Sequence, residues 1–145
     1  MRVAQQHTNI GKVVIVDDQD LELLLCKIVF QKIEPGVCLK TFQSGESVLA
    51  FLRQSRQKEP IDLILLDLKM PKMDGLEVLE FIRKEGLTNC PILIFSTSIL
   101  DTDKERAKRL GADGFLEKPI NIDQNIELFR ELLDKYTDFI PGAIA

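Results

Sequence analysis

Short apolar runs alternate along the chain with longer segments in which apolar residues recur every three or four positions. The short runs predict five β-strands, over 12–18, 37–42, 62–67, 91–96 and 114–118. The longer segments predict five α-helices, over 20–33, 44–54, 74–86, 101–111 and 122–136. In the first of these helices, the residues at helical spacing are Leu21, Leu24, Leu25 and Ile28.

Three of the predicted strands, which contain "VVIV", "LILL" and "ILIF", are continuously apolar instead of alternating. Strands of this kind are covered on both faces, and a helix between successive strands leaves room for parallel crossovers. We therefore predict an α/β fold with a parallel sheet between two layers of helices. The fold forms one domain over 12–138, between loosely held tails over 1–11 and 139–145.

Polar side chains stand where most of the predicted strands end. Asp17 and Asp18 follow the first strand, Asp67 follows the third, Ser96 ends the fourth and Lys118 ends the fifth. The carboxyl ends of parallel strands lie at one edge of the sheet, where open α/β sheets bind their ligands. We therefore expect three carboxylates, a hydroxyl and an ammonium group to meet at this edge.

Some acids near strand ends have a simpler explanation as helix caps. We expect Asp20 to cap the first helix, Ser44 the second and Asp74 the third. Asp17 and Asp18 cannot both cap the first helix, and Asp20 already can. These two adjacent acids therefore need another role.

Three carboxylates at one sheet edge would repel each other, by about 3 kcal/mol for a pair ~5 Å apart at an effective dielectric near 20. A cation is therefore expected among them, and an oxygen-only ligand set without histidine suits Mg²⁺ or Mn²⁺ better than zinc. Lys118 suits an anion such as a phosphoryl group, to which Ser96 can donate a hydrogen bond. A carboxylate that is neither a cap nor a purely structural ligand can attack phosphorus.

The loop after Asp67, "LKMPKMDG", is suited to shape such a site. Pro71 forces Met70 into an extended conformation and prevents a helix from starting at once. The loop can therefore turn a main-chain carbonyl toward the metal. Gly75 permits either close packing or an unusual backbone angle before the next helix.

Composition narrows the function classes. A net charge of -4 gives no general attraction to nucleic acid or anionic membranes, and no apolar run approaches the ~20 residues of a membrane span. The polar N-terminus lacks a secretion signal, so we expect a cytoplasmic protein. Three cysteines without CxxC spacing predict reduced thiols. His7, the only histidine, stands in the polar tail, which argues against histidine catalysis and histidine-metal sites.

Four sequence blocks together resemble a known family. They are "VDD" at 16–18, "LLDLKMPKMDG" at 65–75, "FSTS" at 95–98 and "GADGFLEKP" at 111–119. The chain resembles, from about 12 to 136, the receiver domain of response regulators in bacterial two-component signalling, of the stand-alone chemotaxis type. The resemblance implies a flavodoxin-like, doubly wound sheet with strand order 2-1-3-4-5.

The resemblance also implies residue roles. Asp67 would accept a phosphoryl group from a histidine kinase or a histidine phosphotransfer protein. Mg²⁺ (or Mn²⁺) would bind Asp17, Asp18, Asp67 and the main-chain carbonyl of Lys69. Two further residues, Lys118 and Ser96, would bind the phosphoryl group. The resemblance leaves open whether the Lys118–Pro119 peptide bond is cis or trans.

The switch residues would be Ser96 and Phe115, and the chain departs from common family patterns around them. Ser96 stands where many relatives carry threonine, but the hydroxyl is kept. Phe115 replaces the commoner tyrosine, so no phenolic hydrogen bond can accompany its movement. Thr97 is bulkier than the alanine often found there and would narrow access to Asp67. Lys69 would either lean over the site and alter the lifetime of the phosphoryl group or remain a solvated surface lysine.

The implied function is that of a single-domain response regulator, not a general enzyme. Seven of the nine residues from Asp101 to Arg109 are charged, so this helix is expected to be weakly anchored and to shift on phosphorylation. The chain ends soon after the last helix, so the signal is expected to pass by protein contact or onward phosphotransfer. We expect neither nucleic-acid binding nor membrane insertion.

Three alternative functions compete with this one. Haloacid-dehalogenase-like phosphatases share the Asp18–Asp20 spacing, but Glu22 stands where their motif requires threonine or valine, and the loop after Asp67 is left unexplained. A receiver-like interaction module that is never phosphorylated would carry the same fold. A flavin-binding relative is disfavoured because the acids would repel the cofactor phosphate.

Overall fold

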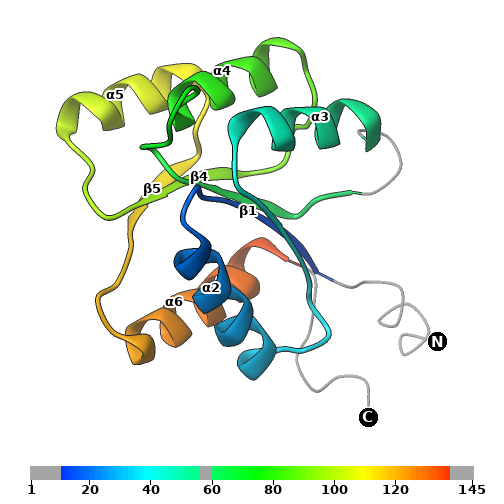
Figure 1. The fold of residues 1–145 in the computed structure, drawn as a ribbon, viewed down its shortest axis with the longest axis vertical. Coiled ribbons are helices and arrows are strands. Elements are labelled where there is room, and N and C mark those ends of the chain that lie inside the picture. The colour runs from blue at the N-terminus through cyan, green and yellow to red at the C-terminus, as the bar shows by residue number, and fades with distance from the viewer. Residues whose placement is uncertain (1–10, 56–59, 138–145) are drawn as a thin grey trace.

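The computed structural model describes residues 11–55 and 60–137, in which five strands and five helices alternate (Figure 1). The strands are β1 (Lys12–Val16), β2 (Cys38–Phe42), β3 (Leu63–Leu66), β4 (Ile92–Ser96) and β5 (Gly114–Glu117). The helices are α2 (Asp20–Ile33), α3 (Gly45–Ser55), α4 (Gly75–Lys84), α5 (Asp101–Leu110) and α6 (Ile122–Tyr136). Every predicted element is confirmed in type and order. The predicted tails and His7 lie outside the described residues, apart from Gly11.

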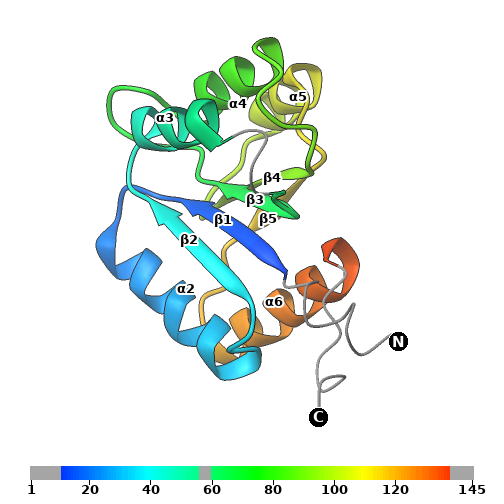
Figure 2. The ribbon, with the colours of Figure 1, turned by 90° about the vertical axis from the view of Figure 1, so that its right-hand side faces the viewer.

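The five strands form one parallel sheet in the order β2-β1-β3-β4-β5. Helices α2 and α6 cover one face, and α3, α4 and α5 cover the other (Figures 1 and 2). From β1 the chain first adds β2 on one side, and then crosses to the other side of β1 to add β3, β4 and β5 in turn. The prediction of a doubly wound, three-layer fold is confirmed.

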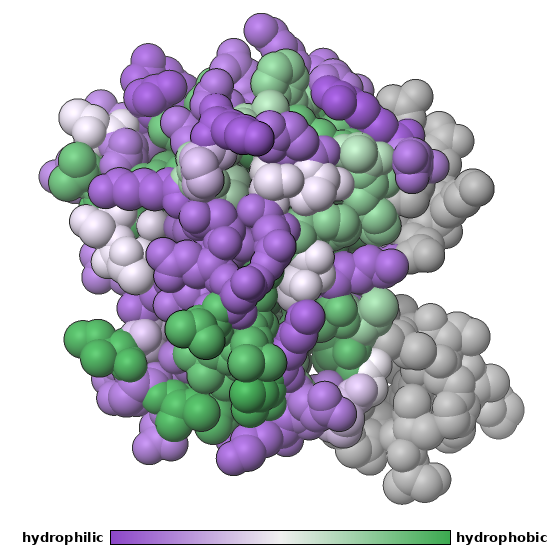
Figure 3. All heavy atoms as spheres, viewed as in Figure 1, coloured by the Kyte–Doolittle hydropathy of each residue, from purple (hydrophilic) through white to green (hydrophobic). Residues whose placement is uncertain are grey.

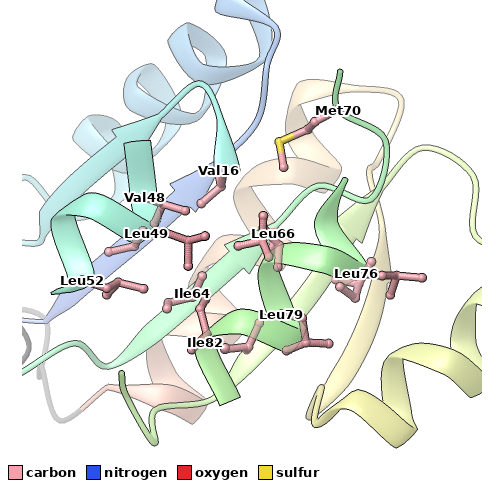
Figure 4. Packing of buried hydrophobic residues seen from close by; sticks show 14 of the residues in the cluster. Val16, Val48, Leu49, Leu52, Ile64, Leu66, Met70, Leu76, Leu79 and Ile82 are labelled. Atoms are coloured by element: carbon pink, nitrogen blue, oxygen red, sulfur yellow. The ribbon is translucent and has the colours of Figure 1, made fainter. Parts of the chain in front are cut away.

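The apolar strands are explained by two hydrophobic clusters, one on each face of the sheet. In β3, Ile64 and Leu66 contact the cluster under α3 and α4, while Leu63 and Leu65 contact the cluster under α2 and α6. Figure 4 shows the first cluster, in which side chains from α3 and α4 point toward the strands. Each fully buried aliphatic side chain contributes about 1.5–3 kcal/mol, so the clusters hold the strand tips firmly in register.

Helix α2 leaves exposed three of the four residues whose spacing predicted it, while the fourth, Leu25, is half-buried against the core. Leu21, Leu24 and Ile28 are 79%, 52% and 45% exposed. The buried face of the helix consists of Leu23, Cys26, Val29, Phe30 and Ile33. This helix is apolar on both sides, so its spacing predicts a helix but does not show which side meets the sheet.

Two of the three predicted helix caps are confirmed. The Asp74 side chain accepts a hydrogen bond from the Glu77 amide at the start of α4, and the Ser44 hydroxyl accepts one from the Ser47 amide at the start of α3. The prediction for Asp20 is wrong, because Gln19 occupies the N-cap position of α2 and Asp20 is the first helical residue.

Two further structural facts bear on the site and its surroundings. The described residues contain no cis peptide bond, so the bond between Lys118 and Pro119 is trans. Among residues 11–55 and 60–137, no helix is both long and apolar enough to span a lipid bilayer.

Candidate metal and phosphoacceptor site

Backbone hydrogen bonds extend the sheet by one residue beyond its strands and fix the polar groups there. The Asp17 amide donates to Phe42 O at 3.0 Å, and the Asp67 amide donates to Val16 O at 2.9 Å. The Lys118 amide donates to the carbonyl of Ser96 at 2.9 Å. Asp17, Asp67 and Lys118 therefore lie at the same carboxyl edge of the sheet, in a rigid frame.

The three acids converge at this edge. Asp17, Asp18 and Asp67 each offer one carboxylate oxygen, and these oxygens lie within 4.8 Å of one another. Asp17 and Asp67 are buried, at 3% and 7% exposure. Among the described residues, Asp18 Oδ1 is a buried side-chain oxygen without a hydrogen-bond partner. A buried carboxylate oxygen of this kind is costly unless it contacts a cation or a donor.

Lys118 supplies the positive charge beside these acids. Its ammonium group donates a hydrogen bond to Asp17 Oδ2 and lies 3.8 Å from Asp67 Oδ2 and 3.9 Å from Glu22 Oε2. It also lies 5.7 Å from the centre of the Phe95 ring, which favours a cation above its face. Burial lowers the pKa of Lys118, but the three acids outweigh this effect and leave the pKa raised. Lys118 therefore stays protonated at neutral pH.

Asp67 is a buried acid whose pKa is shifted by its surroundings. Burial, the largest cause, and the charge of Asp17 raise the pKa of Asp67, while Lys118, the Ser96 hydroxyl and the Leu68 amide lower it; the net result is a pKa of about 6. Ser96 is 2% exposed and ends β4, the neighbouring strand. At neutral pH most Asp67 side chains are ionised, as a nucleophile requires, although the carboxylate is less solvated than in water.

The loop after Asp67 is held by a close approach of its two ends. The Gly75 amide donates to Leu68 O at 2.8 Å, and a Cβ atom on Gly75 would collide with the main-chain oxygen of Asp67. Gly75 therefore serves close packing and not an unusual backbone angle. Lys72 has a φ of 68°, and the Met73 amide donates to Pro71 O at 2.8 Å, so the loop turns sharply after the proline.

The other predicted site residues lie farther out. Phe115 is half-buried and packs against the core on the α5 side of the sheet. Thr97 is exposed directly after Ser96. The Lys69 side chain is exposed and forms no ion pair within the described part of the chain. The roles assigned to these three residues stay predictions.

Glu22 is a site residue that the sequence did not reveal. Its side chain is 33% exposed and faces Lys118 from the first turn of α2. It does not follow a strand, so the search along strand ends passed over it. The available signal was the acidic first turn of α2, which contains Asp20 and Glu22.

The acids have the chemistry of a site for a hard divalent cation. Asp17, Asp18 and Asp67 supply only oxygen ligands. Asp18 Oδ1, which has no hydrogen-bond partner among the described residues, could bind a cation. Lys118 alone cannot balance three carboxylates. The residues therefore fit Mg²⁺ or Mn²⁺, and the Lys69 carbonyl belongs to the same loop as a predicted further ligand.

A doubly wound sheet with an acidic pocket, a lysine and a hydroxyl at its carboxyl edge points to a small α/β signalling domain with a cation site. The model of the response regulator receiver domain matches residues 13–130. The chain belongs to this family, whose members act in two-component signalling.

Individual relatives agree with this assignment. The chain is 30% identical over 122 residues to the polar-differentiation response regulator DivK of Brucella ovis, covering 83% of this chain and 94% of DivK. The phosphorylated cyanobacterial phytochrome response regulator RcpA superposes with a TM-score of 0.78 at 27% identity, over 88% of this chain and 94% of that structure. The Mn²⁺-bound response regulator Rcp1 gives 0.72 at 26%, over 90% and 96%.

The first curated relatives that the chain matches are longer proteins. The chain spans about half of their length or less, with 51%, 29%, 49% and 50% covered in four transcriptional or regulatory proteins. The sequence similarity to these relatives covers that part of their length.

Proposed function

We propose that this chain accepts a phosphoryl group on Asp67 from the phosphohistidine of a kinase or phosphotransfer protein and signals through its Ser96–Phe115 face. The observation that carries the proposal is the convergence of Asp17, Asp18 and Asp67, with oxygens within 4.8 Å, around an acceptor 3.8 Å from Lys118. The manganese-bound and phosphorylated structures named above support the same chemistry in relatives.

In the proposed reaction, an oxygen of ionised Asp67 attacks the phosphorus atom of the donor. The bond from phosphorus to the donor imidazole nitrogen breaks, and its electron pair remains on that nitrogen while an acyl phosphate forms on Asp67. Lys118 and the Ser96 hydroxyl interact with the oxygens of the transferred group. A divalent cation held by Asp17, Asp18 and Asp67 would offset the negative charge that builds up there.

The signal would pass from Ser96 into a weakly held helix. Ser96 is buried, whereas Thr97 and Ser98 are exposed and lead into α5. Ala107 is the buried residue of α5. A small displacement of Ser96 therefore meets little resistance from α5 packing, and the proposed switch is a population shift of α5 and Phe115.

The protein donor would dock on the exposed apolar residues of α2. The donor-docking stripe consists of Leu21, Leu24 and Ile28, and Figure 3 shows hydrophobic side chains gathered over α2 and the start of α6. The stripe begins next to Glu22, which is 3.9 Å from Lys118. A donor that brings its phosphohistidine to Asp67 must contact the surface beside this edge, and a helical donor would match an apolar helix face.

The decisive experiment is incubation with acetyl phosphate and Mg²⁺, followed by intact-protein and peptide mass spectrometry. The parent chain should gain one phosphoryl group on Asp67, and Asp67→Asn should gain none. Asp20→Asn, which removes a nearby exposed acid, should behave like the parent. Absence of uptake by the parent would leave an interaction module that is never phosphorylated.

The docking stripe is tested by comparing two donors. The protein donor is a phosphorylated histidine phosphotransfer protein that phosphorylates the parent chain. The rate of phosphoryl transfer from it to the triple variant Leu21→Ser, Leu24→Ser, Ile28→Ser should be at least about tenfold lower than to the parent. The rate at which the triple variant takes up a phosphoryl group from acetyl phosphate should be unchanged. Phe81→Ser, which alters an exposed apolar residue on α4, is the matched control. Equal losses with both donors would contradict docking on this stripe.

A further inference from the structure

Glu22 occupies a helix position that usually serves in capping, but it has no capping bond here. The third residue of α4, Glu77, accepts a hydrogen bond from the N-cap amide of Asp74 at 3.1 Å. In α2 the equivalent N-cap amide, that of Gln19, donates to Asp17 Oδ1 at 3.0 Å instead. Within residues 11–55 and 60–137, no hydrogen bond is formed by the Glu22 carboxylate, and it faces Lys118 at 3.9 Å.

Three acids lie near the Lys118 ammonium group, but it forms a hydrogen bond to one of them, Asp17. Its ammonium group carries three N–H donors, and its hydrogen bond within the described chain goes to Asp17. Asp67 at 3.8 Å and Glu22 at 3.9 Å are close enough for ion pairing but too distant for hydrogen bonds. The ammonium group can therefore change partner through a small rotation of its side chain.

The carboxylate that holds Lys118 is also a member of the three-acid group. Asp17 Oδ1 already accepts from the Gln19 amide and Asp17 Oδ2 accepts from Lys118. When Asp17 serves a divalent cation, it can no longer neutralise Lys118 to the same degree. Glu22 stands outside the three-acid group, so its carboxylate remains able to receive the ammonium group.

We infer that Glu22 is a positioning residue that takes over Lys118 from Asp17 when the acids bind a divalent cation, and so keeps the ammonium group beside Asp67. This inference rests on the proposed function of Asp67 and adds a residue to it. Glu22 is 33% exposed whereas Lys118 is 8% exposed, so Glu22 is positioned to hold the lysine from the solvent side of the site.

The test is a double-mutant cycle on cation affinity, with Mn²⁺ as the probe and electron paramagnetic resonance of free Mn²⁺ as the readout. Glu22→Gln should weaken Mn²⁺ binding about three- to fivefold, the effect of a partly exposed ion pair. Asp20→Asn, which removes the same charge from the same helical turn, should weaken it less. In a Lys118→Met background, the Glu22→Gln effect should shrink to that of Asp20→Asn.

A simple field effect gives the opposite result. Without Lys118 the charge of Glu22 is no longer compensated, so a pure field effect of Glu22→Gln would be at least as large in the Lys118→Met background. That outcome would overturn the inference, and so would equal effects of Glu22→Gln and Asp20→Asn in the parent. Circular dichroism of every variant verifies folding. The proposed function is tested separately, by whether Asp67 of the parent gains a phosphoryl group from acetyl phosphate.

Discussion

The two edges of the sheet carry polar clusters that differ in charge balance, one neutral and one with an excess of negative charge. At the amino edge, Arg83 donates to the carbonyls of Gly111, Thr88 and Cys90, at 3.1, 2.9 and 3.0 Å, and to Asp113 Oδ2 at 3.1 Å. The cluster holds the ends of α4 and α5 against the starts of β4 and β5.

At the carboxyl edge, the ammonium group of Lys118 faces three carboxylates, a fourth from Asp18 lies beside two of them, and Asp18 Oδ1 has no hydrogen-bond partner among the described residues. The amino edge therefore stabilises the fold, whereas the carboxyl edge keeps an excess of negative charge that only a ligand can balance. The comparison indicates that an unsatisfied polar cluster marks function more clearly than the number of charges does.

The first way to break this comparison is to remove Arg83. Arg83→Ala should lower the free energy of unfolding by about 3 kcal/mol, because several acceptors lose a charged donor. Mg²⁺ affinity should be unchanged, since the acids lie at the other edge. Chemical denaturation with and without Mg²⁺ measures both quantities.

Arg53 provides the control for this variant. It forms an exposed ion pair with Glu85, in which Arg53 Nη2 and Glu85 Oε2 are 2.6 Å apart. Arg53→Ala should change stability little, because surface ion pairs contribute little. A loss in Arg53→Ala as large as that in Arg83→Ala would show that the buried carbonyl contacts of Arg83 are not the source of its effect.

The second prediction concerns the pH dependence of the metal-free protein. The pKa of Asp67 is raised from 3.8 to about 6, so the folded state binds more protons than the unfolded state between these values. Stability from this group is therefore lost as pH rises, by about 2 kcal/mol between pH 4 and pH 7. Denaturation in a chelator should show this fall, and Asp67→Asn should remove that part of it. A parallel pH profile in both proteins would contradict the assignment.

The sequence was sufficient to predict the fold and the meeting of most candidate site residues at one edge, because both depend on strand positions. Strands buried on two faces have a distinctive apolar pattern, and parallel strands bring Asp17, Asp67 and Lys118 to one edge by topology alone. The sequence did not reveal Glu22 or Arg83. Glu22 acts from a helix turn, and Arg83 bonds mainly to main-chain carbonyls, which no pattern of side chains encodes.

Helix α2 shows the same limit from another direction. Its apolar residues lie on two faces, so periodicity could not decide between Leu23 and Leu24 as the buried neighbour. Only packing against β1 and α6 decides that question. The cap prediction for Asp20 failed because the first hydrogen bond of the helix, from the Leu23 amide to Gln19 O at 3.2 Å, makes Gln19 the N-cap residue.

A smaller effect is expected when charge is removed at either edge. Asp18→Asn should raise the unfolding free energy of the metal-free protein by about 1–2 kcal/mol, because repulsion with Asp17 and Asp67 falls. Mg²⁺ should raise the melting temperature of the parent and no longer that of Asp18→Asn. Asp113→Asn at the opposite edge should lower stability instead, since that carboxylate pairs with Arg83. Differential scanning calorimetry with and without Mg²⁺ measures both changes in stability. A change in the same direction for both variants would contradict the proposed difference between the two edges.

The smallest expected effect lies in α5, which joins the two edges. Its C-terminal end is held by Ala107, which is 1% exposed, and by the hydrogen bond from Arg83 to Gly111. Its N-terminal end begins at Leu100, which is 61% exposed and follows the loop from Ser96. A movement that starts at Ser96 should therefore loosen or shift the first turns and leave the last turn in place.

Amide hydrogen exchange with and without Mg²⁺ and fluoroberyllate, which imitates a phosphoryl group, measures this asymmetry. We expect a change of a few fold over residues 97–106 and little change over 108–113. In Arg83→Ala the change should extend through the whole helix, because the C-terminal anchor is lost. Uniform change in the parent would show that α5 moves as one body and that the amino edge does not restrain it. Equal protection over 97–116 with and without the mimic would refute the proposed switch itself.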